Sequence, residues 1–253
     1  MEKLLGLPVL ASQHGKDVDN LIIYVHWLMI VLFVGWLAYF AYALFRFHRS
    51  RNPKADYVGV KSHASTYIEG AVAIVEGVLL VLVAVPLWAK AVGEGNLPAE
   101  NQSTVIQIVA QQFNWNARYP GKDAKFGRQD MHLVNTTNIF GVDYTDASSK
   151  DDIQVNNEIH VVVNKPVIAY ISSKDVIHSF KIIAMRVTQD AIPGMRVPVW
   201  FTPTIVGTYQ INCAQLCGNS HSAMTGGSLV VQTQADFDKW LATKTPGAAS
   251  SLE

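Results

Sequence analysis

The sequence predicts an α+β membrane protein in which a hairpin of two transmembrane helices precedes an all-β domain. Two long apolar runs, residues 21–45 and 70–89, lie in the N-terminal part of the chain. From about residue 95 the pattern changes to short β-branched or aromatic runs separated by Gly, Pro, Asn and Asp, which is typical of strands and turns. We expect an N-terminal segment and hairpin over residues 1–94, a β domain over 95–243 and a disordered tail over 244–253.

The first apolar run is long enough to cross a membrane. Residues 21–45 contain no Asp, Glu, Lys or Arg. As a helix they would span about 37 Å, against a hydrocarbon thickness of about 30 Å. A cleavable signal peptide is the alternative, but it would have a shorter apolar core and a basic leader. This run is aromatic and follows Asp17 and Asp19, so we favour a transmembrane helix.

The second run, residues 70–89, is interrupted only by Glu76 and would be about 30 Å long as a helix. The loop between the runs carries an excess of basic residues over the single acidic Asp56, namely Arg46, Arg49, Arg51, Lys54 and Lys61. The positive-inside rule therefore predicts a cytoplasmic loop. Both termini and the β domain would then face the periplasm or the cell exterior, with the helices in a bacterial inner membrane.

Acidic residues in or beside a membrane helix are functional candidates, because burying their charge is costly. Glu69 lies at the predicted cytoplasmic end of the second helix, where a solvated interfacial charge is the alternative interpretation. Glu76 lies two turns deeper, and the sequence assigns it no role.

The β domain is expected to contain about seven strands, which is enough for a sandwich or a Greek-key barrel of antiparallel strands. They are predicted at residues 105–111, 159–163, 167–172, 177–183, 197–202, 207–212 and 228–233. A short helix with Phe237, Trp240 and Leu241 on one face is expected over residues 235–243.

The segment of residues 213–224 concentrates possible metal ligands. It contains Cys213, Cys217, His221 and Met224, at offsets of four, four and three. Thiolate, imidazole and thioether together favour copper. A single-copper site would need only one Cys, so the second thiol allows two sulfur atoms to bridge two metal ions. A further imidazole should come from another strand, and His178 is the best placed.

Two other interpretations of this segment remain. A disulfide is common in extracytoplasmic domains but would need neither His221 nor Met224. Zinc would use the sulfur atoms and His221 while ignoring the thioether.

These residues resemble subunit II of haem-copper cytochrome c oxidases. The motif matches that family's C-x-E-x-C-x3-H-x2-M with Gln215 in the Glu position, and residues 190–194 match its Asp-Ala-Ile-Pro-Gly turn. The resemblance extends from about residue 20 to about residue 242. It implies a cupredoxin-like Greek-key barrel and a dinuclear copper centre, CuA, with two copper ions per chain. The ligands that it implies are His178, Cys213, the backbone carbonyl of Gln215, Cys217, His221 and Met224.

The resemblance also implies roles for residues outside the copper ligands. Phe113 takes the position where electrons enter, and Trp115 matches the next tryptophan of the family; both rings could instead belong to the core. Asp175 matches a donor-docking residue and Glu69 the mouth of a proton pathway. Glu76 has no assigned counterpart in the family, and we expect it to face subunit I, either protonated or paired. Magnesium at the subunit I boundary is doubtful, because Gln215 offers only a neutral oxygen.

The expected function is an electron relay within an oxidoreductase, with no dioxygen chemistry in this chain itself. Subunit I is an obligatory partner, and a cytochrome c is the expected donor. An acidic run could attract a basic donor, although a solvated loop is the commoner explanation. The run consists of Asp143, Asp146, Asp151, Asp152 and Glu158.

Other functions fit less well. A quinol oxidase subunit would lack the copper ligands, a copper carrier or assembly factor would lack the hairpin, and nitrous oxide reductase carries its CuA domain on a soluble propeller. The 20 basic and 20 acidic residues give a formal charge of zero, which argues against nucleic-acid binding.

Overall fold

The computed structural model describes residues 2–59 and 61–246, so most of the predicted disordered tail lies outside the described residues. The chain divides into two compact units. One contains residues up to 6 together with 17–90, and the other contains residues 7–16 together with the chain from residue 91 onward.

The first unit is helical. The short α1 (Glu2–Leu5) is followed by α2 (Gly15–Arg46), and the second long helix contains α3 (Ala64–Leu79), a π-helical turn (Leu80–Ala84) and α4 (Val85–Val92). Both predicted spans are confirmed as long apolar helices. They are longer than predicted, because the helices continue beyond the apolar runs. Their large apolar side chains are mostly exposed, as expected for surfaces that face lipid or other membrane chains.

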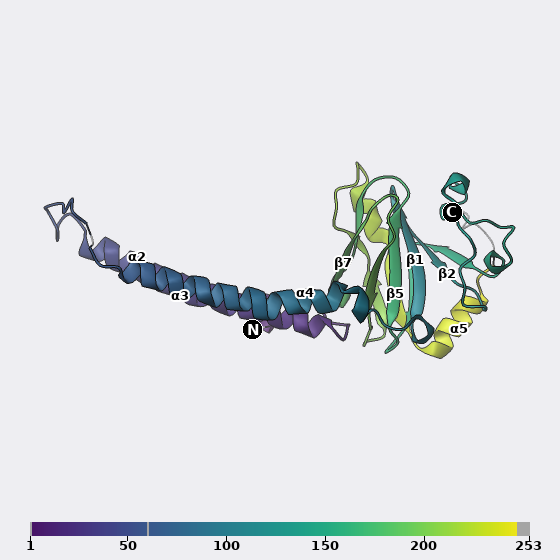
Figure 1. The fold of residues 1–253 in the computed structure, drawn as a ribbon, viewed down its shortest axis with the longest axis horizontal. Coiled ribbons are helices and arrows are strands. Elements are labelled where there is room, and N and C mark those ends of the chain that lie inside the picture. The colour runs from purple at the N-terminus through teal and green to yellow at the C-terminus, as the bar shows by residue number, and fades with distance from the viewer. Residues whose placement is uncertain (1, 60, 247–253) are drawn as a thin grey trace. The chain divides into compact units, whose positions relative to one another are not determined.

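The two long helices run alongside each other in opposite directions (Figure 1). At one end Lys90 Nζ lies 3.0 Å from Asp17 Oδ2. Near the other end, side chains of both helices line a cavity of about 630 Å³, which includes Trp36, Tyr39 and Glu69. These contacts at both ends establish the hairpin.

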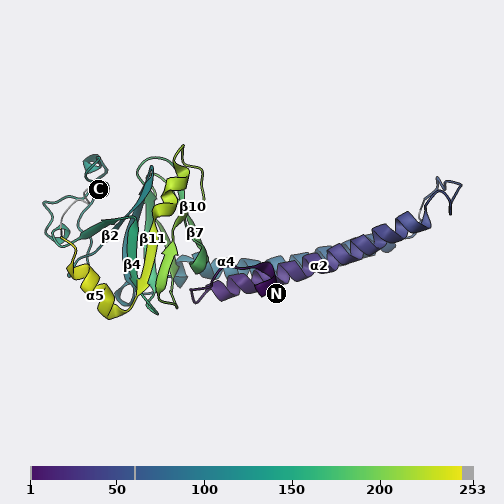
Figure 2. The same ribbon diagram turned by 180° about the vertical axis from the view of Figure 1, so that it is seen from behind.

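The described residues of the second unit form eleven strands in three sheets. Figure 2 shows β4 and β11 side by side. The five-stranded sheet has the order β3 (Ile153–Asn156), β2 (Asn114–Tyr119), β1 (Thr104–Gln111), β5 (Val167–Ser173) and β8 (Val197–Phe201). One three-stranded sheet has the order β10 (Asn212–Cys213), β6 (His178–Ile182) and β7 (Val187–Ala191). The other has the order β4 (Glu158–Val162), β11 (Ser228–Gln232) and β9 (Gly207–Gln210).

The all-β prediction is confirmed, with three differences. The strands form a sandwich of separate sheets, and the described residues form no closed barrel. Two pairings, β1 with β5 and β4 with β11, are parallel, although an antiparallel sheet was predicted. The strand expected at residues 207–212 is divided into β9 and β10, which belong to different sheets. Pairing partners are distant in sequence, so local patterning does not determine these features.

Strands β2, β3 and β7 were not predicted, because polar residues interrupt their apolar pattern. In β2 the fully buried Arg118 forms an ion pair with the buried Asp152, and it also donates to Gln107 Oε1. Asp152 therefore does not belong to a surface patch or a solvated loop, although the other four residues of the predicted acidic run are at least partly exposed. Asp143 of the same run is paired with Arg128, at 2.6 Å. Hydrogen bonds from Thr145 and Arg128 lower the pKa of Asp143 to about 2.

The core of the β unit lies between its sheets. In β1 the side chains of Ile106, Ile108 and Ala110 alternate into it and are at most 1% exposed. The predicted C-terminal helix is confirmed as α5 (Gln234–Ala242), with Phe237 buried and Trp240 stacked on His160 at a ring separation of 4.0 Å. This helix closes one end of the domain, and β10 lies towards the opposite end (Figure 2).

A segment before the first long helix also belongs to the β unit. Ala11 is fully buried, its backbone N–H donates to Ala184 O at 2.8 Å, and its carbonyl accepts from Thr204 N at 2.8 Å. Ser12 Oγ donates to Met185 O at 2.7 Å. Residues on both sides of the helical hairpin are therefore joined in one domain, which the sequence did not indicate.

Candidate metal centre

The predicted ligands come together because two short strands pair in a fixed register. Strand β10 pairs antiparallel with β6, which sets Cys213 opposite Phe180, and Ala214 N then donates to Ser179 O at 2.9 Å. His178 begins β6, and its side chain points to the same buried face as Phe180 because strand residues alternate. The chain after Cys213 turns back through a loop that contains Gln215 and Cys217. The 3₁₀ helix His221–Gly226 then supplies His221 and Met224.

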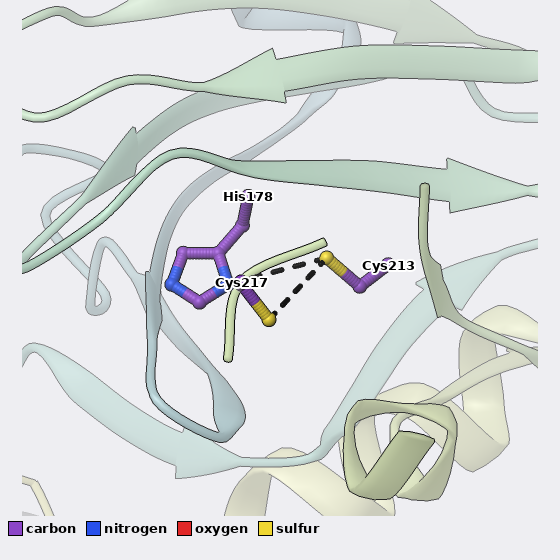
Figure 3. Close-up of side chains that lie close together, drawn as sticks. All are labelled: His178, Cys213 and Cys217. Atoms are coloured by element: carbon purple, nitrogen blue, oxygen red, sulfur yellow. Dashed lines mark hydrogen bonds between the residues drawn. The ribbon is translucent and has the colours of Figure 1, made fainter. Parts of the chain in front are cut away.

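Six possible ligand atoms converge beside β6 and β10. They belong to His178, Cys213, Gln215, Cys217, His221 and Met224. Figure 3 shows His178, Cys213 and Cys217 turned toward one another, with His178 Nδ1 and Cys217 Sγ each 4.0 Å from Cys213 Sγ. Cys217 Sγ lies 3.4 Å from both His221 Nδ1 and Met224 Sδ. Met224 Sδ is 3.1 Å from His178 Nδ1, and the Gln215 carbonyl is 3.1 Å from Cys213 Sγ.

Hydrogen bonds from β2 and from the turn between β1 and β2 hold this loop in place. Trp115 Nε1 on β2 donates to Met224 O at 3.1 Å, and the tryptophan ring lies edge-on to His178. Gln112 Nε2 donates to Cys217 O at 2.6 Å. The ligand loop is thereby fixed to the five-stranded sheet as well as to β6.

Asp175 orients the imidazole of His178. Its carboxylate accepts from His178 Nε2 at 2.9 Å, from Gln112 N at 2.7 Å and from Val176 N at 2.7 Å. Because a carboxylate can only accept, Nε2 carries the hydrogen and Nδ1 directs its lone pair at the sulfur atoms. Burial raises the pKa of Asp175, but these three hydrogen bonds outweigh it and lower the pKa below its usual value. The role of Asp175 in this contact was not predicted, although its spacing of three residues from His178 was visible.

The two cysteines are free thiols, and a separation of 4.0 Å between their sulfur atoms is far longer than a disulfide bond. Burial and the neighbouring Cys213 raise the pKa of Cys217 to about 11. A metal ion binds the thiolate and must therefore displace this proton. Two soft sulfur ligands, two imidazoles and a thioether suit copper, and the cysteine and histidine cluster is compatible with it.

The other predicted residues lie in different settings. The Gln215 side chain is exposed, so its backbone carbonyl alone faces the cluster. Phe113 is half-buried, whereas Trp115 is fully buried. Glu69 and Glu76 are both exposed on α3 in the helical unit. The contact of Gln112 with Cys217 O could not be predicted, because it joins residues 105 positions apart in sequence.

Fold and site together define a membrane-anchored protein with a buried cysteine and histidine centre in a β domain. Residues 104–233 match the family model described as cytochrome c oxidase subunit II, periplasmic domain. The alternative cytochrome c oxidase subunit 2 of Bradyrhizobium diazoefficiens is 29% identical over 228 residues, covering 88% of this chain and 79% of that protein. The probable cytochrome c oxidase subunit 2 of Rickettsia bellii is 30% identical over 222 residues, covering 87% of this chain and 76% of that protein.

Among solved structures, the periplasmic domain of subunit II of cytochrome oxidase (CoxB) of Bradyrhizobium japonicum is 28% identical, with a TM-score of 0.42. The match covers 58% of this chain and 95% of that one. The chain belongs to the cytochrome c oxidase subunit II family. It is a subunit of a haem-copper oxidase complex and therefore part of an oxidoreductase.

Proposed function

We propose that this chain is the electron-accepting subunit of its oxidase and holds a dinuclear copper centre of the CuA type. The observation that carries the proposal is the convergence of six ligand atoms from β6, β10 and the following loop. A mononuclear copper site would need one thiol, and the second thiol favours a bridged pair. Such a centre, when bound, would accept single electrons from a donor and release them to an acceptor.

Each proposed ligand has a definite part in holding the pair. Cys213 and Cys217 would bridge the two ions as thiolates, and each imidazole would cap one ion through Nδ1. The Gln215 carbonyl and the Met224 thioether would complete the set. Four of these side chains are at most 9% exposed, so the protein would shield bound ions from water and hold these ligands in place. The four are His178, Cys213, Cys217 and Met224.

Electrons would enter at the surface beside this centre. Phe113 is the partly exposed ring there, while the buried Trp115 lies behind it against His178. The proposed donor is a cytochrome c that docks beside this centre, where Asp175 is partly exposed. The proposed acceptor is a haem in subunit I, where oxygen would be reduced to water.

The membrane orientation follows from charge and connectivity. The basic loop between α2 and α3 favours the cytoplasmic side. The hydrogen bonds of Ala11 with Ala184 and Thr204 favour an even number of membrane crossings between that segment and the β unit. We propose that both lie outside the cytoplasmic membrane, which puts the copper centre within reach of a periplasmic donor. Protection of the connecting loop from protease in intact cells would support this orientation.

Glu69 is the proposed start of a proton pathway into subunit I. It lines the cavity between α2 and α3 beside Trp36 and Tyr39. A Glu69→Gln variant should lower oxygen consumption by the whole oxidase at unchanged copper content. We do not expect magnesium to bind through Gln215, because an amide oxygen is neutral.

Copper analysis and electron paramagnetic resonance of the copper-loaded full chain in detergent test the central proposal. The expected result is two copper ions per chain, with hyperfine splitting from two equivalent nuclei. One copper ion with splitting from a single nucleus, or no bound copper, would refute the dinuclear centre. Cys213→Ser should abolish the two-nucleus spectrum, whereas Ser222→Ala, an exposed position in the same loop, should preserve it.

A further inference from the structure

An apolar, uncharged surface surrounds the candidate metal centre. Leu216 lies between the two cysteines and is 78% exposed. Ile177 and Val176, which precede His178, are 46% and 39% exposed. Phe113 is the partly exposed ring of the same region. Large apolar side chains that are exposed together usually mark a contact surface.

These residues belong to three segments that meet at Gln112. Its backbone N–H donates to Asp175 Oδ2 at 2.7 Å, and its side chain donates to Cys217 O at 2.6 Å. The Phe113 ring lies against Gly218 of the ligand loop, since a Cβ added at this glycine would lie 3.0 Å from Phe113 Cζ. The exposed apolar side chains therefore flank one small area next to the proposed copper ligands.

The charge of this area is close to zero. Residues 111–114 and 213–227 contain no Asp, Glu, Lys or Arg, and residues 173–178 contain only Lys174 and Asp175, whose formal charges cancel. Residues 190–196, which pair with this segment, add Asp190 and Arg196, whose formal charges also cancel. The Asp175 carboxylate already accepts three hydrogen bonds, and Lys174 Nζ donates to Asn135 O at 2.9 Å. Two acidic residues that could have attracted a basic donor are paired elsewhere, Asp152 with Arg118 and Asp143 with Arg128.

We propose that this surface, formed by Phe113, Val176, Ile177 and Leu216, docks an electron-donor protein whose contact face is apolar and uncharged. The inference rests on the proposed electron-accepting function. The position directly over the ligands favours an electron donor as occupant, because electron transfer slows steeply with distance. Encounters of this kind need only small interfaces, below about 1,200 Å².

The proposal has a kinetic consequence. Association steered by opposite charges is fast at low salt and slows steeply as ionic strength rises. A neutral contact loses this dependence and associates at about 10⁵–10⁶ M⁻¹s⁻¹. The second-order rate for this oxidase should therefore change by less than about twofold between low and moderate salt.

The test uses the purified oxidase that contains this chain and follows oxygen consumption. Two protein donors are compared, a lysine-rich cytochrome c and its variant with the haem-edge lysines replaced by glutamine. The small reductant tetramethyl-p-phenylenediamine with ascorbate serves as a donor that needs no docking surface. We expect the neutralised cytochrome to be oxidised at least as fast as the basic one. A basic cytochrome that is more than tenfold faster at low salt would overturn the proposal.

Variants locate the surface. Leu216→Ser and Ile177→Ser should each lower the rate with the neutralised cytochrome about five- to tenfold, as expected for central contact residues, and leave the rate with the small reductant unchanged. Val206→Ser is the matched control, because this side chain is 55% exposed. Val206 directly precedes Gly207, the first residue of β9, whereas the ligand loop follows the other end of that strand. This variant should change neither rate.

The outcomes separate the two proposals. If the small reductant drives no oxygen consumption in the unmodified oxidase, the proposed function itself fails. If it does, but Leu216→Ser leaves the cytochrome rate unchanged, only the docking surface is refuted. Loss of the other oxidase subunits from the Leu216→Ser preparation would also refute it, because the surface would then be a subunit interface.

Discussion

Replacing Asp175 with alanine should weaken copper binding without removing any ligand. The carboxylate accepts from His178 Nε2 at 2.9 Å and thereby keeps Nδ1 turned to the sulfur atoms. It also accepts from the backbone N–H groups of Gln112 and Val176, each at 2.7 Å. In Asp175→Ala all three donors lose their partner, and the His178 ring can rotate.

The magnitude follows from the hydrogen bond to the imidazole. A bond to a charged group contributes about 1.5–3 kcal/mol, and each 1.4 kcal/mol corresponds to a factor of about ten. Loss of such an outer contact typically costs about 10–100-fold in metal affinity. We therefore expect copper affinity, measured by competition with a chelator on the full chain, to fall about 10–100-fold.

Two further variants make this result specific. Asp175→Asn keeps an oxygen that can accept from His178, so the loss should be less than about tenfold. Asp238→Ala removes an exposed carboxylate from α5, whose only described partner is the Gln234 amide, and should leave copper affinity unchanged. If Asp175→Ala binds copper as tightly as the unmodified chain, the orienting role of this carboxylate is wrong.

Three other predictions concern the supporting structure. Asp152→Ala leaves the charge of the buried Arg118 guanidinium unpaired, so it should lower the unfolding free energy by about 3–5 kcal/mol. The double variant Arg118→Met, Asp152→Leu should recover most of this loss. Urea denaturation followed by tryptophan fluorescence measures both variants, and a double variant as unstable as Asp152→Ala would contradict this account. Trp115→Phe removes the hydrogen bond to Met224 O, so copper should transfer to a chelator faster while circular dichroism stays unchanged; an unchanged transfer rate would argue against this anchor. The pKa of Asp143 is lowered to about 2, so its ionised form contributes stability above the unfolded value of about 4, and this contribution is lost as pH falls toward about 2. The destabilisation caused by Asp143→Asn should therefore be largest above pH about 4 and disappear near pH about 2 in thermal melts, and a pH-independent effect would contradict the assignment.

Local features of the sequence were sufficient for the broad architecture. Hydropathy over consecutive residues predicted both membrane helices, because crossing a bilayer demands a long uninterrupted apolar run. Seven of the strands and the final helix were predicted near their observed positions from alternating apolar residues. Strand β2 was not predicted, because the charged Arg118 interrupts its apolar pattern. The ion pair with the buried Asp152 allows Arg118 to occupy a core position.

The sequence by itself determined the set of ligand types, since Cys213, Cys217, His221 and Met224 lie within one short segment. Only the tertiary structure brought His178 to them, because the register of β6 and β10 places it near Cys213, 35 residues away in sequence. It also assigned Asp175 to the imidazole, buried Trp115 behind the centre and paired Asp143 and Asp152 with arginines. The physical reason is that these properties depend on contacts between distant segments, which residue type and local spacing do not encode.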